Sequence, residues 1–469
     1  MKTRLFPVPV IACMTGLLLL CMESRSGNLI KNPGFEDSAT NPAGWTIKGP
    51  IASMQPETGI DSRTRFSGAS SLRMESHNPN CHGIAVQTVE IIPGQTYLFS
   101  ARFRGENIQS IDKSVLIRIK WFKGDEQLGY NYIYHVEEAS GGWLLAQDRI
   151  RSVEGAATAE ISLVFRWSTG TVWWDDVSME PCLEVIPQTI KVGTLYFRPP
   201  GPTIEKNIAL MGEMLDQAGQ AGCDIVCLPE GWPTCNTSLG MTRVEANTLS
   251  GSASVMMSQK AKQYGMYIVS GLYSWSGDTL KNIALLYDRN GNIQGIYEKV
   301  QLPDSETEQG AVPGNTFPVF TTDFGTVGIL ICWDSAFPEI SRILALNGAK
   351  ILFCPIWGDV RDPESWKITA RSRAMDNGVF FVTSIFDGHS VIVNPAGEVL
   401  AESGTQGTLL TATIDVNFNP QWHWIGNAGL GVWDGVWRKD RRSDVFGKIG
   451  EFMTAPGTGS TDSTYKHHK

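Results

Sequence analysis

Three short segments of the 469-residue chain place a reactive side chain at the end of an apolar run: CDIVCLPE ends in Glu230, GIYEKV contains Lys299, and VGILICWD contains Cys332. In α/β sheets, ligand sites form at such strand ends. A thiolate is an effective nucleophile, a carboxylate can accept its proton, and an ammonium can stabilise the anion that develops on a substrate carbonyl. Together the three residue types predict nucleophilic catalysis by Cys332.

Taken alone, each of these residues has an ordinary structural explanation. A free Cys is among the most buried residue types, so Cys332 by itself is more typical of a core position. Glu230 alone could cap the segment after its strand, and Lys299 alone is typical of a solvated hairpin. Burying Glu or Lys is costly unless each has a charged partner, so the joint occurrence favours a single site.

The elements that must position these residues follow from the pattern between 190 and 440. Apolar residues at Ile204, Ile208, Met211, Leu215 and Ala218 predict a helical face that ends at Gly222, before the strand CDIVCLPE. A second helix around 254–264 precedes YIVSGLY, and FPEISRILALNG precedes KILFCPIW. Strands that alternate with helices predict a layered α/β domain. Turns at Asn290-Gly291 and Ala396-Gly397 predict hairpins, and hence mixed sheets.

The stretch 28–182 has a different pattern. Its short alternating segments are separated by Gly, Pro and Asn turns, and they include SLRMES, YLFSARFRG, SVLIRIKWF, AEISLVFRW and TVWWDDVSME. Several short strands at regular spacing predict an antiparallel β-sandwich. We therefore expect two domains, with a boundary near 181–188, and a disordered Gly/Ser/Thr-rich tail at 454–469.

The N-terminal residues 1–26 resemble a secretory signal peptide. Lys2 and Arg4 precede an apolar run from Val8 to Met22, and small residues follow at Ser24 and Ser26. The run is short for a membrane-spanning helix, so an uncleaved anchor is disfavoured. We expect a secreted or periplasmic protein, with acylation of Cys21 as the lipoprotein alternative.

Charge and cysteine content narrow the remaining function classes. A net charge of -9 without a long basic run argues against nucleic-acid binding. No C-x-x-C pair occurs, which argues against a structural zinc site, and we expect no metal and no cofactor. An oxidising compartment permits disulfides, and Cys81 with Cys182 is the first pair to test, whereas Cys332 must remain a free thiol.

The order of motifs in the second domain resembles the nitrilase superfamily of carbon-nitrogen hydrolases. The matching segments, within about 190–437, are CLPEGW, YEKVQLP, GILICWDSAFPE, ALNGAKILFCP and ARSRAMDNGVFFVTS. The resemblance implies a four-layer αββα sandwich with mixed sheets. It also implies a triad with Glu230 as base, Lys299 as the oxyanion-stabilising residue and Cys332 as nucleophile.

The resemblance also implies supporting residues. The family's second glutamate falls on Glu306, with Glu308 as a competitor, and Trp333 takes the place of an aromatic residue whose backbone N–H helps to form the oxyanion hole. Two departures concern the subfamily: Gln301 stands where many members carry His, and Asp376-Asn377 stands where a Glu-Asn pair is usual.

The implied reaction is hydrolysis of a non-peptide carbon-nitrogen bond through a thioester on Cys332, on an amide or carbamoyl group rather than a nitrile. A homodimer or higher oligomer, formed through the hydrolase domain, is also implied. The alternative function is a catalytically inactive nitrilase-like binding or scaffold protein at the cell surface.

The first domain resembles the jelly-roll carbohydrate-binding modules of extracellular glycanases, through NLIKNPGFE, the pair Gly44-Trp45 and VWWDDVSME. This implies a polysaccharide partner, although a spacer or docking domain is the alternative. Of Trp173 and Trp174, which point to opposite faces of one strand, one is expected in the core. Glu36 and Asp176 resemble positions near a structural calcium. An aromatic platform for sugar rings is expected from Trp121, Tyr130, Tyr132, Tyr134 and Trp143.

Overall fold

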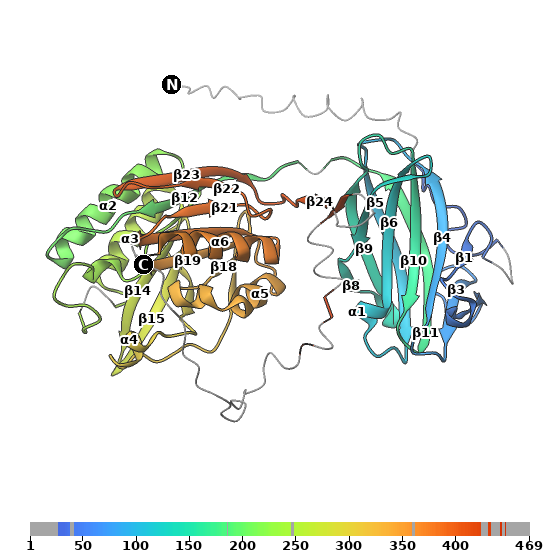
Figure 1. Cartoon of the computed structure of the whole chain (residues 1–469), viewed down its shortest axis with the longest axis horizontal. Coiled ribbons are helices and arrows are strands. Elements are labelled where there is room, and N and C mark those ends of the chain that lie inside the picture. The colour runs from blue at the N-terminus through green and yellow to red at the C-terminus, as the bar shows by residue number, and fades with distance from the viewer. Residues whose placement is uncertain are drawn as a thin grey trace, which may run out of the picture. The chain divides into compact units, whose positions relative to one another are not determined.

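The computed structural model describes residues 27–37, 42–184, 186–244, 248–358, 362–423, 430–432, 441–442 and 446. The predicted signal peptide at 1–26 and the predicted tail at 454–469 lie outside the described residues. The chain divides into two compact units, one running to Glu184 and the other from there to Trp422 (Figure 1). Each unit has its own core.

The first unit consists of two antiparallel sheets. One has the order β1-β4-β10-β6-β7, and the other has the order β2-β3-β11-β5-β9-β8. Leu430 and Gly431 of β25 (Leu430–Val432) pair in parallel with Gly129 and Tyr130 of β7. The elements are β1 (Thr46–Lys48), β2 (Glu57–Asp61), β3 (Ser71–Ser76), β4 (His82–Glu90), β5 (Thr96–Glu106), α1 (Ile111–Ser114), β6 (Val115–Lys123), β7 (Glu126–Ile133), β8 (Val136–Glu138), β9 (Leu144–Arg151), β10 (Thr158–Arg166) and β11 (Gly170–Pro181).

Alternation along these strands builds the core of the first unit. On β6, Ile117, Ile119 and Trp121 point into the core that the two sheets share, while Arg118 lies on the other face. Trp174 is in the same core, as expected for one member of the tryptophan pair. Trp173 is also buried, and its indole N–H donates to Asp61.

The expected aromatic platform is wrong for its two tryptophans. Trp121 is fully buried, and its indole N–H donates to Asn131 Oδ1 at 2.6 Å. Trp143 is also buried and packs edge-on against Phe66. Tyr130 is buried as well. Buried rings cannot stack on a sugar, so of the five candidates only the partly exposed Tyr132 and Tyr134 remain.

The expected disulfide is also wrong, because Cys81 and Cys182 are both free. The sulfur of Cys81 contacts the carbonyl of Ser168, just before β11, whereas Cys182 follows the last residue of that strand. A strand of twelve residues separates the two positions, roughly 40 Å at the usual rise. Disulfide bonds need Cα atoms within about 7 Å.

The proposed calcium position does not suit a cation. Glu36 accepts hydrogen bonds from the backbone N–H of Ala69 and Ser70. Asp176 accepts one from the hydroxyl of Ser67 and pairs with Arg102 at 3.3 Å. Donors that point at these carboxylates already supply the positive partners that a cation would supply.

The second unit contains two six-stranded mixed sheets, in the orders β16-β15-β14-β13-β12-β23 and β17-β18-β19-β20-β21-β22. The strands of the first are β12 (Thr189–Tyr196), β13 (Ile225–Cys227), β14 (Tyr267–Ser276), β15 (Thr279–Tyr287), β16 (Ile293–Glu298) and β23 (Thr408–Asp415). Those of the second are β17 (Val319–Thr322), β18 (Gly325–Ile329), β19 (Ile351–Gly358), β20 (Phe380–Asp387), β21 (Val391–Val393) and β22 (Val399–Glu402). The short strand β24 (Gln421–His423) follows β23 along the chain.

Helices cover the outer faces of these sheets (Figure 1). Helices α2 (Ile204–Gln220) and α3 (Ser252–Tyr264) pack on the first sheet, while α5 (Pro338–Leu346) and α6 (Pro363–Asn377) pack on the second. The predicted helix after 204 is therefore confirmed, and the Thr203 side chain caps its first turn. The layers run helix, sheet, sheet, helix.

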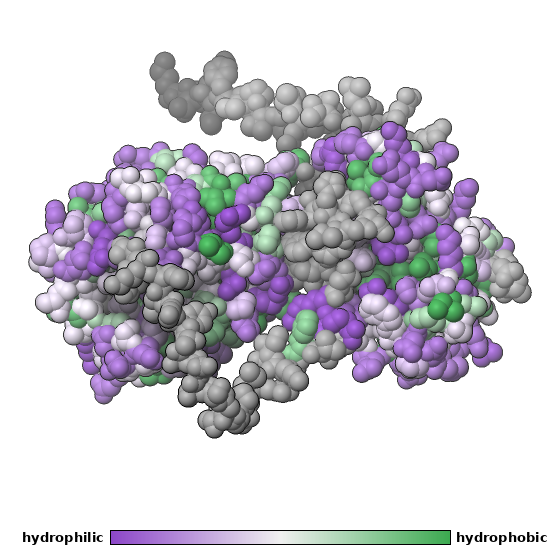
Figure 2. Space-filling view, viewed as in Figure 1, coloured by the Kyte–Doolittle hydropathy of each residue, from purple (hydrophilic) through white to green (hydrophobic). Residues whose placement is uncertain are grey.

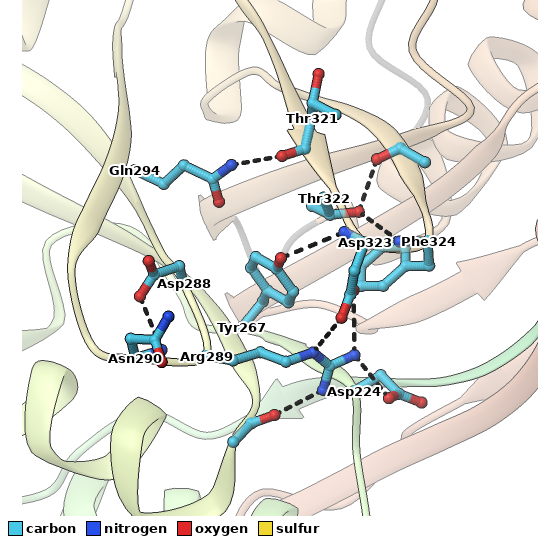
Figure 3. A network of polar contacts seen from close by, with 12 residues as sticks. Asp224, Tyr267, Asp288, Arg289, Asn290, Gln294, Thr321, Thr322, Asp323 and Phe324 are labelled. Carbon is cyan, nitrogen blue, oxygen red and sulfur yellow. Dashed lines mark hydrogen bonds and ion pairs between the residues drawn. The ribbon is translucent and has the colours of Figure 1, made fainter.

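A polar network at one edge joins the two sheets of the second unit (Figure 3). Arg289, in the hairpin between β15 and β16, donates to Asp224 at 2.9 Å and to Asp323 at 2.8 Å. Asp323 lies in the turn between β17 and β18, and its N–H donates to the Tyr267 hydroxyl. Gln294 also donates to the carbonyl of Thr321. These contacts fix the register of one sheet against the other.

The visible surfaces of both units are mainly hydrophilic, with small scattered hydrophobic patches (Figure 2). Among the residues that the structure describes, no helix combines the length and hydrophobicity that crossing a bilayer requires.

Candidate active site

Glu230 lies just beyond the end of β13 and is almost completely buried. Its Oε2 accepts a hydrogen bond of 2.9 Å from the backbone N–H of Trp357, and its Oε1 accepts one of 2.6 Å from Asn282. The neighbouring strand β14 passes close to it at Gly271, where an added Cβ would lie 2.8 Å from the Cα of Glu230. Only glycine therefore allows this approach.

Lys299 follows the last residue of β16, and its side chain has no exposed surface. Its backbone N–H donates to the carbonyl of Asn282 at 2.9 Å. Its Nζ lies 2.8 Å from Oε1 of Glu230 and 2.5 Å from Oε1 of Glu306. Burial alone would lower the pKa of Lys299, but the negative charges around it raise that pKa above its ordinary value, so the ammonium stays protonated.

Glu306 rather than Glu308 is the second glutamate of the cluster. Glu306 lies on the short helix α4 (Asp304–Thr307) and is buried, whereas Glu308 is exposed. Burial raises the pKa of Glu306, as does the negative charge of Glu230, while Lys299 and Asn282 act in the opposite direction. Two carboxylates therefore share one ammonium in a dry site.

Cys332 begins the 3-10 helix Cys332–Ala336, three residues after the end of β18. Burial raises the pKa of its thiol well above the ordinary value, as do the charge of Glu230 and a hydrogen bond with it, while Lys299 and the N–H of Trp357 oppose the rise. The resting group is therefore a thiol in contact with Glu230. Such a thiol needs a base in order to react.

Asp334 is a further residue of the site that the sequence did not single out. Its carboxylate accepts hydrogen bonds from the N–H of Ile331 at 2.9 Å, from the N–H of Gln301 at 2.7 Å and from the Tyr297 hydroxyl at 2.8 Å. Burial raises the pKa of Asp334 to about 6, although these hydrogen bonds lower it. The residue ties the segment that carries Lys299 to the turn that carries Cys332.

Asn282 and Tyr273 were also missed. Asn282 donates to Glu230 and, at 3.0 Å, to Oε2 of Glu306, so it bridges both carboxylates. Burial raises the pKa of Tyr273 well above its ordinary value, and the charges of Glu230 and Glu306 add to the rise. The sequence does contain a signal for Asn282. It lies in the middle of the apolar strand TLKNIALLY, where a buried amide needs a hydrogen-bond partner.

The chain resembles known proteins in the region that forms this site. A family model described as Carbon-nitrogen hydrolase matches residues 197–423. An omega-amidase of Xenopus laevis is 30% identical over an alignment of 239 residues, and the alignment covers 46% of this chain and 86% of the relative. This chain belongs to the carbon-nitrogen hydrolase family of the nitrilase superfamily. It is an enzyme of the amidase/nitrilase type.

Two further similarities to known proteins were found. A probable nitrilase of Schizosaccharomyces pombe is 30% identical over 211 residues, covering 41% of this chain and 76% of the relative. The crystal structure of an amidase from Nesterenkonia sp. is 24% identical and has a TM-score of 0.46, covering 50% of this chain and 94% of that one.

The remaining residues predicted for the hydrolase site lie in different environments. Trp333 is 44% exposed, and its ring lies edge-on to Phe337. The side chain of Asp376 accepts from Ser372, and Asn377 is buried and donates to a carbonyl within α6. The backbone of Gln301 takes part in the site through Asp334.

One acidic cluster of the hydrolase lies apart from the site. Glu364, His389 and Glu402 are the one group among the described residues with metal-ligand spacing. Lys367 contacts Glu364 at 2.8 Å and Glu402 at 3.1 Å, so an ammonium already offsets part of the negative charge of the cluster.

Proposed function

We propose that this protein hydrolyses a non-peptide amide or carbamoyl bond, with Cys332 as nucleophile, Glu230 as general base and acid, and Lys299 as the group that stabilises the oxyanion. The observation that carries the proposal is the buried Lys299 ammonium, which contacts Glu230 at 2.8 Å beside the Cys332 thiol. A nucleophile, a base and a cation meet in a largely buried site, where electrostatic stabilisation is strong.

The reaction takes place in two halves. Glu230 accepts the thiol proton while Cys332 sulfur bonds to the substrate carbon, and Lys299 stabilises the oxyanion. The carbon-nitrogen bond then breaks, and Glu230 returns the proton to the leaving ammonia or amine, which leaves a thioester. In the second half Glu230 takes a proton from water, the hydroxide attacks the thioester, and the acid leaves as the thiol is restored. Trp333 supplies a backbone N–H to the oxyanion.

The supporting roles follow from the contacts of Lys299. Glu306 is the second carboxylate in contact with the ammonium, at 2.5 Å, and does not itself exchange a proton with substrate. Because the ammonium is fixed between two carboxylates, little reorganisation is needed when the oxyanion forms.

An amide is favoured over a nitrile because several relatives, including those from Xenopus laevis and Bos taurus, are named omega-amidases. No metal or organic cofactor takes part in this chemistry. We also propose a homodimer formed through α5 and α6, since Leu346, Ile368 and Met375 on these helices expose apolar surface.

We further propose that the protein is exported and that its first unit binds a polymer. The charged, apolar and small-residue order of 1–26 supports a secreted or periplasmic location, with lipid attachment at Cys21 as the alternative. The first unit, as a jelly-roll carbohydrate-binding module, then holds the enzyme on a glycan and raises the local substrate concentration.

The test combines activity with covalent trapping. Purified protein is incubated with a panel of small primary amides, ammonia is measured, and the intact protein is quenched in acid for mass spectrometry. Wild-type protein should release ammonia and carry an acyl adduct that peptide mapping assigns to Cys332. Cys332→Ala should lose both signals.

Cys223→Ala is the matched control, because Cys223 is also buried and burial raises its pKa to about 11. This variant should keep full activity and the adduct. Equal ammonia release from Cys332→Ala and wild type, or an adduct on another cysteine, would reject the assigned nucleophile.

A further inference from the structure

The first unit has a polar pocket on the outer face of the sheet β1-β4-β10-β6-β7. Its volume is about 290 Å³, close to the lower end of ligand pockets, roughly 300 Å³. Polar groups on three strands line it: His82 on β4, Arg118 on β6 and Arg166 on β10. Tyr132, on β7 opposite Arg118, adds an aromatic ring.

The floor of the pocket is apolar. Ile84, Leu116 and Val164 lie in register on adjacent strands and all line it. An apolar floor with a few convergent polar groups is typical of a small-molecule site. Sugar rings present such a combination, because their C–H faces pack on apolar and aromatic surfaces while their substituents accept hydrogen bonds.

Side-chain contacts hold Arg166 in place. The Nε of Arg166 donates to the carbonyl of Lys113 at 3.3 Å, and its guanidinium lies 3.8 Å from the Trp167 ring centroid. Arg118 pairs across the sheet with Ser162, and the buried Nε of Arg118 has no hydrogen-bond partner. The hydroxyl of Ser162, itself almost fully buried, has none either. Each of these two polar groups can therefore form a further hydrogen bond.

The charge of this face is positive. Lys48 and Lys120 share one carboxylate, Glu160, at 3.5 Å and 3.8 Å. Arg118 and Arg166 add two further cations, and Glu90 on β4 adds a second carboxylate, so cations still outnumber carboxylates among these side chains. Burial lowers the pKa of His82, and the charges of Arg166 and Arg118 lower it further, so the histidine is neutral near pH 7. The whole chain has a net charge of -9, so this positive charge is a local feature of the face.

We infer that this pocket binds an acidic saccharide, a sugar ring whose carboxylate or sulfate group pairs with Arg118 and Arg166 while the ring packs on Tyr132 and the apolar floor. Planar guanidinium groups match carboxylate and sulfate oxygens in a two-pronged geometry. The inference deepens the proposed polymer-binding role of the first unit and is independent of the amidase reaction.

The test measures binding of the full-length protein to soluble polymers by isothermal titration calorimetry. Polygalacturonate carries carboxylates, dextran sulfate carries sulfates, dextran is an uncharged polysaccharide, and poly-L-glutamate is a polyanion without sugars. We expect at least one acidic polysaccharide to bind about tenfold more tightly than either dextran or poly-L-glutamate. The two acidic polymers distinguish carboxylate from sulfate as the group recognised.

Arg118→Gln should weaken that binding about tenfold, and Arg118→Lys should weaken it less, because the charge remains. Arg149→Gln is the matched control, since Arg149 is an exposed arginine on β9 of the other sheet. All three variants should keep the circular dichroism spectrum and the thermal unfolding of the wild-type protein, which verifies that the first unit is folded.

Equal binding of dextran, equal binding of poly-L-glutamate, or unchanged affinity of Arg118→Gln would overturn the inference. Binding of dextran alone would support the proposed glycan binding but would contradict the inference that the ligand is acidic. Failure to bind any polysaccharide would remove both, whereas the amidase proposal depends only on ammonia release and the Cys332 adduct.

Discussion

The Nζ of Lys299 lies 2.8 Å from Oε1 of Glu230, and neither side chain has appreciable exposed surface. A buried pair of this kind does not by itself make a fold more stable, because both charges must be taken out of water. The pair instead fixes a cation and a carboxylate beside Cys332. Removing one partner should therefore lower both stability and activity, because it leaves the other charge buried without a partner.

Lys299→Met should lower both activity and stability. It leaves Glu230 and Glu306 buried without their cation, and loss of one partner of a buried ion pair costs about 3–5 kcal/mol. Urea unfolding measures the change in the free energy of unfolding. The double variant Lys299→Met/Glu306→Gln should recover part of that loss but no activity, and a single variant as stable as wild type would contradict the buried ion pair.

Glu306→Gln should have a smaller effect than Glu230→Gln. The first change weakens the hold on Lys299 and should lower kcat about tenfold, whereas the second removes the proton acceptor and should lower kcat about 10²- to 10⁴-fold. Steady-state kinetics on one amide gives both values. Equal losses would mean that the two carboxylates share the proton-transfer role.

Asn282→Leu should destabilise the protein by about 1–3 kcal/mol, because it leaves two buried carboxylates short of a donor. The amide bridges Glu230 and Glu306. Asn290→Ala, in the hairpin after β15, is the control and should change stability little. Thermal unfolding compares the two, and a similar shift in both would remove the special role of Asn282.

Asp334 should give opposite pH trends for activity and stability. Its folded pKa is raised to about 6 from 3.8, so its contribution to stability is fully present below pH 3.8 and is lost as the pH rises through 6, on the order of 3 kcal/mol. Activity should rise over the same interval, because the ionised carboxylate accepts the hydrogen bonds that hold Gln301 and Ile331.

The Asp334 prediction is checked with kcat/KM and urea unfolding between about pH 4.5 and about pH 7.5. Asp334→Asn should be less active at all pH values and should lack both trends. An unchanged pH profile in this variant would assign the trends to another group.

A reducing agent should leave the melting temperature of the protein unchanged, because the described cysteines, Cys81 and Cys182 included, are free. Thiol titration with and without denaturant counts the free groups. A fall in melting temperature of several degrees on reduction would show that a disulfide stabilises the first unit.

Sequence pattern predicted much of the second unit because its signals are local. Helical spacing before Gly222 and the polar ends of apolar strands are read over a few residues, and the structure places Glu230, Lys299 and Glu306 together. Asp334 and Asn282 were missed because their roles depend on partners on other strands. Such non-local contacts cannot be predicted from the spacing of residues along the sequence.

In the first unit, the alternation of residues along the strands predicts which side chains are buried. Trp121 is two and four residues from Ile119 and Ile117, so the period of two already placed it in the core. The same period puts Arg118 on the outer face. The pairing of Cys81 with Cys182 failed because sequence carries no information about which ends of the strands meet.

The backbone of Cys332 has a φ of +46°, in the left-handed region that residues with a Cβ avoid. Such a residue costs of order 1–3 kcal/mol, and glycine would adopt the same turn at less cost. A chain selected for durability alone would therefore carry glycine here. Directed evolution that selects for thermal stability and not for activity should therefore replace Cys332 early. The resulting protein should be more stable but inactive.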